Sequence, residues 1–180
     1  MGSPKQLLPY QDNNLLQHAV HEALGTGFSP VIVVLGATAN EISPVIKNTN
    51  IIIVENEEWQ EGLGSSVRAG ISALTEHASG ADSAILMLCD QPFVTAALLT
   101  QLVETKTTTN KKIVASVYRD TAGVPVLFDN SFFPELLQLK GPDGAKKLLL
   151  QYAEEVATVL FPEGAVDIDT PEDYERLFNT

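Results

Sequence analysis

Two short segments combine a turn with a cation or with backbone donors, an arrangement that binds phosphate. In MGSPKQLLPY, Gly2 opens a Gly-Ser-Pro turn and Lys5 follows it, where an ammonium can meet a phosphate as a point charge. In VENEEWQEGLGSSVRAG, two glycines let the backbone approach a planar ligand, and two serines open a helix N-terminus that favours anions. The residues of this predicted nucleotide-binding loop are Gly62, Gly64, Ser65 and Ser66. The alternatives are a solvated surface lysine and an acidic loop with a serine cap.

A third segment, MLCDQPFV, brings an aspartate to the end of an apolar strand. Asp90 is followed by Pro92, which fixes the turn. A carboxylate at the tip of a buried strand is costly unless it meets water, a donor or a cation. Asp90 is therefore a candidate metal ligand, and a cap for the next helix is the alternative.

A fourth segment, GAVDIDTPEDYERL, holds paired carboxylates just before a predicted helix. Asp167 and Asp169 are two residues apart and share one side of an extended chain. Such a pair can complete an octahedral Mg²⁺ site together with substrate phosphates. The alternative is a capping box in which Asp169 or Thr170 pairs with Glu172 or Asp173.

Composition excludes several classes of partner. The 180 residues carry a formal net charge of −12, so that a groove for nucleic acid or an anionic membrane is not expected. A phosphate-bearing ligand must then be small and be neutralised locally. The sequence has no apolar run long enough to span a membrane and no start of the signal-peptide type. Its single cysteine, Cys89, is interpreted as a buried packing residue. We expect a soluble, cytoplasmic protein.

Strands and helices alternate along the chain, which predicts right-handed βαβ units, a mostly parallel sheet and one domain over residues 1–180. Ligands of such sheets gather beyond the carboxyl ends of the strands. Strands are expected at 31–35, 51–54, 81–90, 111–118, 123–128 and 156–161, the first three buried. Helices are expected at 13–27, 37–49 (capped by Thr38 and broken by Pro44), 65–77, from 95, 132–139, 144–152 and 170–178. The histidines, His18, His21 and His77, fall on helices away from the strand tips and suggest no side-chain nucleophile.

Six segments in register over the chain resemble the MobA-like nucleotidyltransferases, most closely the molybdenum cofactor cytidylyltransferase branch. They are MGSPKQLLPY, NEEWQEGLGSSVRAGISAL, MLCDQP, YRDTAGVPVLF, GPDGAKKLL and DIDTPEDYERL. The resemblance implies a three-layer Rossmann-like α/β domain of the nucleotide-diphospho-sugar transferase type. It also implies transfer of a nucleotidyl group from an NTP, CTP favoured, to a molybdopterin-type cofactor with release of pyrophosphate.

The resemblance also assigns roles to residues. Gly2 and Lys5 would contact the triphosphate, and the loop from Gly62 to Ser66 would bind base and ribose. Asp90 would hold Mg²⁺ and act with Lys5 in catalysis, with Asp167 or Asp169 as the second carboxylate at the metal. The second substrate would meet Gly123, Pro125, Asp143, Gly144 and Lys146. A molybdenum hydroxylase would be a possible partner.

One departure from the family is expected to matter. The family begins with an apolar strand that runs into a loop of the form LAAGxSxRMGxxK, whereas this sequence starts at the Met-Gly near the end of that loop. The expected shortfall is roughly fifteen to twenty residues, including a central strand. Two alternatives therefore stay open: a MobA-like transferase for another phosphorylated acceptor, and a non-catalytic carrier of the molybdenum cofactor.

Overall fold

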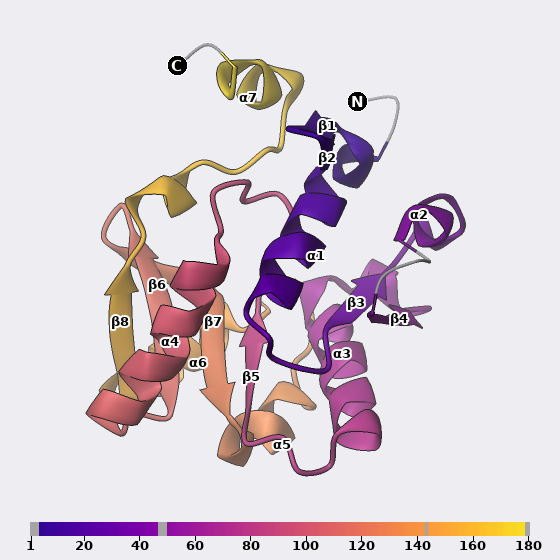
Figure 1. Ribbon diagram of the computed structural model, residues 1–180. Helices are drawn as coiled ribbons and strands as arrows, with labels where there is room; N and C mark the ends of the chain where they lie inside the picture. The colour runs from indigo at the N-terminus through magenta and orange to yellow at the C-terminus, as the bar shows by residue number, and fades with distance from the viewer. Residues whose placement is uncertain (1–3, 47–49, 143, 179–180) are drawn as a thin grey trace.

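The computed structural model describes residues 4–46, 50–142 and 144–178. Its main sheet has four strands in the order β5-β7-β6-β8 (Figure 1). These strands are β5 (Ser83–Leu86), β6 (Ile113–Tyr118), β7 (Thr121–Asp129) and β8 (Val156–Leu160). β6 and β8 are parallel, and β7 runs antiparallel to both β5 and β6. The carboxyl ends of β5, β6 and β8 therefore meet at one edge of the sheet.

The antiparallel strand follows from the short connection between β6 and β7. Arg119 and Asp120 both have positive φ, 48° and 59°, as in the two-residue turns that join hairpin strands. The register of the pair then shifts between Ala115 and Ser116. Pro125 lies in this bulge, where its missing N–H removes no ladder bond. The α/β class expected from the sequence is confirmed, with a sheet that is mixed because of β7.

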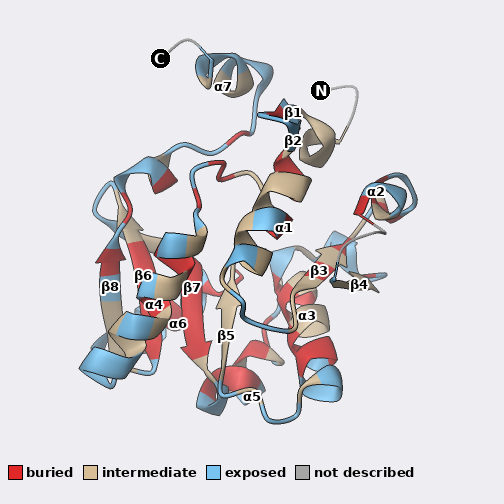
Figure 2. Ribbon diagram, in the orientation of Figure 1, coloured by how far each residue is buried: buried red, intermediate tan, exposed pale blue. Residues whose placement is uncertain are grey.

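Helices cover both faces of the main sheet because apolar residues alternate along its strands. One face packs against helices α3 (Leu63–His77), α5 (Phe133–Leu136) and α6 (Lys146–Gln151), and the other against α4 (Ala96–Thr109). The first cluster receives Ile113, Ala115, Val126 and Phe128, and the second receives Val114, Leu127 and Val159. The central strands β6 and β7 are accordingly the most buried part of the sheet (Figure 2). The result is a three-layer domain.

Two further strands form a separate parallel pair. β3 (Ile32–Leu35) and β4 (Ile52–Glu55) are connected by helix α2 (Ala39–Ile46). Within the described parts of the chain, this pair shares no ladder with β5. The predictions that these two strands are buried on both faces and that β5 is a buried strand were wrong. Only Val33 and Leu35 are buried in β3, and β4 and β5 are at most half-buried, because each of these three strands has a single strand partner.

Two predicted boundaries were also wrong. The strand expected to run to Asp90 ends at Leu86, where its pairing with β7 stops at Val126, just before the bulge. Pro44 does not end α2, which continues to Ile46. Burial of apolar residues of α2 against β3 offsets the backbone bond that the proline removes.

The N-terminal region reaches the sheet through helix α1 (Leu15–Gly25), which lies against α4 (Figure 1). A capping box of Asn14 and Gln17 starts this helix, as the sequence predicted for an asparagine cap. A two-residue hairpin precedes it, made of β1 (Pro9–Tyr10) and β2 (Asn13–Asn14). The last helix is α7 (Pro171–Arg176), with proline at its first position. None of the helices in the described residues is both long and apolar enough for a membrane span.

Candidate active site

Lys5 joins two carboxylates that are far from it in the sequence. Its Nζ donates to Asp90 Oδ2 and to Asp169 Oδ1, each at 2.7 Å. We call these three residues the lysine cluster. Burial alone would lower the pKa of the ammonium, but the bonds to Asp169 and Asp90 outweigh it and raise that pKa above its ordinary 10.5. Lys5 is therefore fully charged near neutral pH.

The backbone brings the two aspartates of the lysine cluster together. Asp90 lies four residues beyond the end of β5, and its carbonyl accepts from Ile168 N at 3.0 Å. Ile168 is fully buried, so it anchors the segment on which Asp169 stands. Asp167, the other carboxylate of the predicted pair, is exposed and lines a cavity next to Asp90. Asp90 and Asp169 thus share a cation, and Asp167 lies nearby.

Neither aspartate of the lysine cluster caps a helix. Helix α4 is capped by Thr95, whose side chain accepts from Leu98 N. Helix α7 starts with a capping box made of Thr170 and Asp173, and the bonds from Thr170 lower the pKa of Asp173. The capping box considered for this segment is confirmed with these two residues, and Asp169 is left to face Lys5.

The lysine cluster offers two carboxylates to a divalent cation, and the described residues hold no group of three or more His, Cys, Asp or Glu side chains placed for a metal, so that further ligands would come from substrate phosphates. Carboxylate oxygens are the ligands that Mg²⁺ prefers, and an ammonium already occupies a cation position between Asp90 and Asp169. Asp90 Oδ1 is buried and has no hydrogen-bond partner in the described structure. A buried acceptor without a donor is unfavourable and is relieved by a bound cation. The residues present therefore fit a divalent metal.

We call the segment from Gly62 to Ser66 the glycine loop. Its serines are held by Asn56, which follows β4. Asn56 is buried, and its Nδ2 donates to Ser65 Oγ at 2.8 Å and to Ser66 Oγ at 3.0 Å. Ser65 is also buried, and its hydroxyl donates to Gly62 O. The serines therefore do not cap α3, and Ser66 is the more accessible of the two. Sequence reasoning missed Asn56, although its place at a strand end is the kind of signal used for Asp90.

Gly62 and Gly64 serve a packing role that the sequence did not reveal. A Cβ at Gly62, whose φ is +104°, would lie 2.9 Å from Pro142 Cα, and one at Gly64 would lie 3.0 Å from Gly141 O. Gly64 N also donates to Gly141 O at 3.1 Å. The absence of side chains at Gly62 and Gly64 therefore makes room for the backbone of residues 141–142. That backbone covers the side of the two glycines on which a ligand was expected.

A cavity of about 270 Å³ lies at the carboxyl ends of β5, β6 and β8. Its lining includes Asp90, Gln91, Tyr118, Arg119, Thr121, Val124 and Asp167. Gln91 Nε2 donates to Gly164 O at 3.0 Å, which assigns the other amide atom as oxygen; this Oε1 is buried without a partner among the described residues. Two consecutive residues of the cavity lining thus carry a buried oxygen without a hydrogen-bond partner among the described residues. Gln91 was missed in the sequence, although it belongs to the MLCDQP segment.

The residues predicted for the second substrate separate into two groups. Gly123 and Pro125 belong to β7 beside the cavity, and Gly123 packs under the Tyr118 hydroxyl. Gly144 instead packs against Leu63 at the start of α3, and Lys146 begins α6. Gly2 and Asp143, also predicted as site residues, lie outside the described residues.

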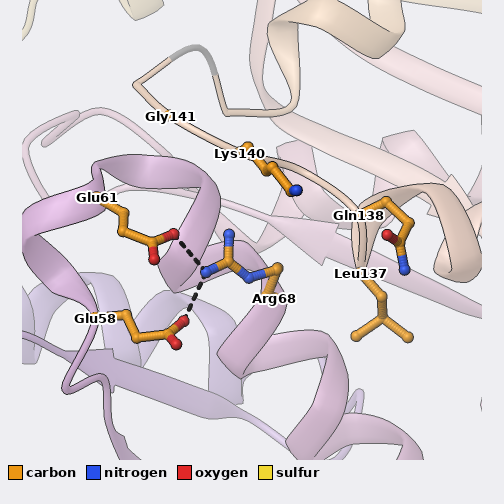
Figure 3. A pocket seen from close by; sticks show the side chains of 7 residues that line it. All are labelled: Glu58, Glu61, Arg68, Leu137, Gln138, Lys140 and Gly141. Atoms are coloured by element: carbon orange, nitrogen blue, oxygen red, sulfur yellow. Dashed lines mark hydrogen bonds and ion pairs between the residues drawn. The ribbon is translucent and has the colours of Figure 1, made fainter.

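A second cavity, of about 610 Å³, lies beside the glycine loop (Figure 3). Here Arg68 donates from Nη2 to Glu58 at 2.6 Å and to Glu61 at 2.7 Å, and from Nη1 to Leu139 O at 2.6 Å. We call Arg68, Glu58 and Glu61 the arginine cluster. Lys140 also lines this cavity, on the segment that covers the two glycines.

His18 and Cys89 stand close to the site without joining it. His18 was expected to be solvated and away from the strand tips, but its Nε2 lies 3.0 Å from Pro92 O, and its ring packs edge-on against Tyr10. That expectation was wrong, because α1 lies across the segment that follows Asp90. Burial, followed by the charge of Asp90, raises the pKa of the Cys89 thiol to about 12, so that it is neutral and unreactive near pH 7.

A three-layer α/β domain with two carboxylates beyond its strand ends is typical of proteins that bind small phosphate-bearing ligands together with a metal ion. The sequence matches the MobA-like NTP transferase domain over residues 1–156, and the chain belongs to this family. The nucleotidyltransferase class and fold expected from the sequence are thereby confirmed.

Individual relatives support the same assignment. The chain is 28% identical to the purine catabolism protein PucB of Bacillus subtilis over 190 residues, covering 98% of this chain and 89% of that protein. It is 26% identical to the molybdenum cofactor cytidylyltransferase of Escherichia coli K12 over 176 residues, covering 97% and 86%. Among solved structures, Rv0371c of Mycobacterium tuberculosis H37Rv in complex with manganese is 31% identical, with a TM-score of 0.78 over 99% of this chain and 94% of that chain.

Proposed function

We propose that this protein transfers the nucleotidyl group of CTP to the phosphate of a molybdopterin-type cofactor and releases pyrophosphate. The observation that carries the proposal is the lysine cluster, in which Asp90 and Asp169 share one cation beyond the strand ends. The cluster contains an aspartate that lines the 270 Å³ cavity, which has room for an acceptor. Similarity to the cytidylyltransferase of Escherichia coli supports CTP and the pterin acceptor.

The reaction needs positioning and charge neutralisation rather than a side-chain nucleophile. An oxygen of the acceptor phosphate attacks the α-phosphorus, the bond to the bridging oxygen of the β-phosphate breaks, and pyrophosphate leaves with the electron pair. Lys5 neutralises the triphosphate, Ser66 on the accessible side of the Gly62–Ser66 loop contacts the nucleoside, and Asp90 and Asp169 would hold Mg²⁺. Bound Mg²⁺ supplies further neutralisation of charge on the phosphates.

The acceptor is assigned to the 270 Å³ cavity in this proposal. Gly123 and Pro125 shape the strand at its edge, and Gln91 is part of its lining. Gly144 and Lys146 belong to the segment that supports the glycine loop, so we assign them to the nucleotide side. A cytoplasmic molybdenum hydroxylase would receive the product.

The test is pyrophosphate release by the purified chain with Mg²⁺ and CTP, GTP or ATP, with purified molybdopterin cofactor as acceptor. We expect turnover with CTP, a requirement for the acceptor, and loss of activity in Asp90→Asn. Glu58→Gln, which removes a carboxylate from the arginine cluster, is the matched control and should retain activity. Absence of turnover with every nucleotide would reject the proposal.

A second candidate is transfer to a different phosphorylated acceptor. The identity to PucB, a purine catabolism protein, supports this candidate, because relatives with different roles match nearly the whole chain at similar identity. The same assay with sugar phosphates and other phosphorylated alcohols distinguishes the two. Pyrophosphate release that requires one of these acceptors, and not the pterin, would select the second candidate.

A further inference from the structure

The ammonium of Lys5 lies where a divalent cation shared by Asp90 and Asp169 would lie. It is 2.7 Å from one oxygen of each carboxylate. Mg²⁺ binds such oxygens at about 2.0–2.1 Å, and an ammonium held on the same two oxygens would repel it strongly. Both cations therefore cannot use this pair of oxygens together.

Resting on the proposed nucleotidyl transfer, we infer that Lys5 is an exchangeable counter-ion: it holds Asp90 and Asp169 together in the free protein, and the incoming divalent cation displaces it toward the triphosphate. The same side chain then has two successive partners, first the carboxylates and afterwards the phosphates of the nucleotide. Lys5 is a positioning residue for the metal site in the first state.

Three features of the lysine cluster suit an exchange. The Lys5 side chain is 29% exposed, so it has a path to solvent. Only two of its three N–H donors have acceptors in the described structure, which leaves one for water or phosphate. Asp90 Oδ1 is buried and unpartnered while Lys5 occupies Oδ2. The ammonium thus leaves unsatisfied an acceptor that a multivalent cation can use.

The first test is binding of Mn²⁺ alone, followed by electron paramagnetic resonance without nucleotide or acceptor. If the free protein leaves the carboxylates open only about one-tenth of the time, Lys5→Met should bind Mn²⁺ about tenfold more tightly than the unmodified chain. Unchanged or weaker binding by Lys5→Met would overturn the inference, because the ammonium would then support the metal site or have no effect on it.

Two control variants separate displacement from a general effect of charge. Arg119→Met removes a positive charge that lines the same cavity as Asp90 without contacting either carboxylate of the cluster in the described structure. Lys106→Met removes a lysine of similar exposure, which pairs with Asp129 at 2.9 Å. Both should change Mn²⁺ affinity by about twofold or less at ordinary salt. An increase in Arg119→Met equal to that in Lys5→Met would overturn the inference.

The second test observes the lysine directly. Lysines are labelled biosynthetically with ¹³C, which leaves the ammonium unmodified, and the Cε resonance of Lys5 is assigned by its absence in Lys5→Met. Saturating Mg²⁺ should shift this resonance toward that of a solvated lysine, and a resonance that does not move would reject displacement. Neither test needs turnover, so a protein that exchanges Lys5 for metal but transfers no nucleotidyl group would reject the proposed function alone.

Discussion

The lysine cluster and the arginine cluster have the same charge pattern, one cation between two carboxylates, with nearly the same distances. The ion-pair distances are 2.7 and 2.7 Å in the first and 2.6 and 2.7 Å in the second. The partners of Lys5 are 85 and 164 residues away in sequence, whereas those of Arg68 are 10 and 7 residues away. The first cluster joins distant parts of the fold, and the second joins one turn to the helix that follows it (Figure 3).

Burial and hydrogen bonding separate the two clusters further. The side chain of Asp90 is 16% exposed, whereas the other three carboxylates are exposed: 63% for Asp169, 64% for Glu58 and 51% for Glu61. Arg68 has a third bond, to the Leu139 carbonyl, which ties its guanidinium to the segment over the glycine loop. A guanidinium with three such bonds is a structural link. A flexible lysine beside a carboxylate oxygen without a partner is instead suited to replacement by another cation. The comparison teaches that charge pattern alone does not identify a metal site.

The largest expected effect comes from removing the buried carboxylate of the lysine cluster. Asp90→Asn should weaken Mg·CTP binding by about 100-fold or more while leaving the fold intact, because the variant loses the proposed metal ligand and not a helix cap. Thermal melts with and without Mg·CTP measure both quantities. Glu58→Gln is the matched control. A mutant that melts several degrees lower but keeps its full Mg·CTP-induced shift would end the assignment of Asp90 as a metal ligand.

The glycine loop next to the arginine cluster should show the largest change in stability. Gly62→Ala should lower the free energy of unfolding by about 2–4 kcal/mol, because it adds a strained φ and a clash with the Pro142 backbone. Gly27→Ala is the control: its φ is also positive, +74°, but a Cβ there meets nothing within 4 Å. It should cost only about 1 kcal/mol. Equal costs in urea unfolding would show that the loop does not pack as described.

Burial of the Cys89 thiol, which is adjacent to Asp90 in the sequence, makes the stability of the fold depend on pH. Folding raises the pKa of the Cys89 thiol from 9.0 to about 12. As pH rises, the thiol of the unfolded chain therefore loses its proton before the thiol of the folded chain does. The contribution of the protonated thiol to the free energy of unfolding is thus complete below pH 9 and is lost as pH rises toward 12. The free energy of unfolding falls by at most about 1.4 kcal/mol per pH unit in this range.

Urea unfolding of the unmodified chain and Cys89→Ala between pH 8 and 11 measures this loss as a narrowing difference in stability. Lys5, whose raised pKa also costs stability at alkaline pH, is present in both proteins and cancels. Parallel pH profiles for the two proteins would show that the thiol is not desolvated.

The smallest effect should come from removing one of the two exposed carboxylates of the arginine cluster. Glu61→Gln removes a carboxylate that is half exposed, and Arg68 keeps its bonds to Glu58 and Leu139. The melting temperature should change by about 1 °C or less, as for most surface ion pairs. Mn²⁺ affinity should stay the same. A clear loss of metal binding in this variant would place the metal at the arginine cluster and reverse the comparison.

Much of the fold and part of the site were predictable because they depend on local patterns. Apolar alternation located β6 and β8, and the Asn14 cap and Pro171 located the starts of α1 and α7. The end of β5 and the half-burial of β3 could not be read in this way, since both depend on which strands pair with them.

By itself, the sequence determined the α/β class, the family and the candidate residues Lys5, Asp90 and Asp169, because residue types, spacing and order are properties of the chain. Tertiary structure alone decided that these three meet at one point, that Asp169 rather than Thr170 faces the lysine, and that Gly62 and Gly64 support a neighbouring loop. It also brought Gln91 and Tyr118 into one cavity. The physical reason is that contacts across 85 and 164 residues depend on strand pairing and helix packing, which no local pattern encodes.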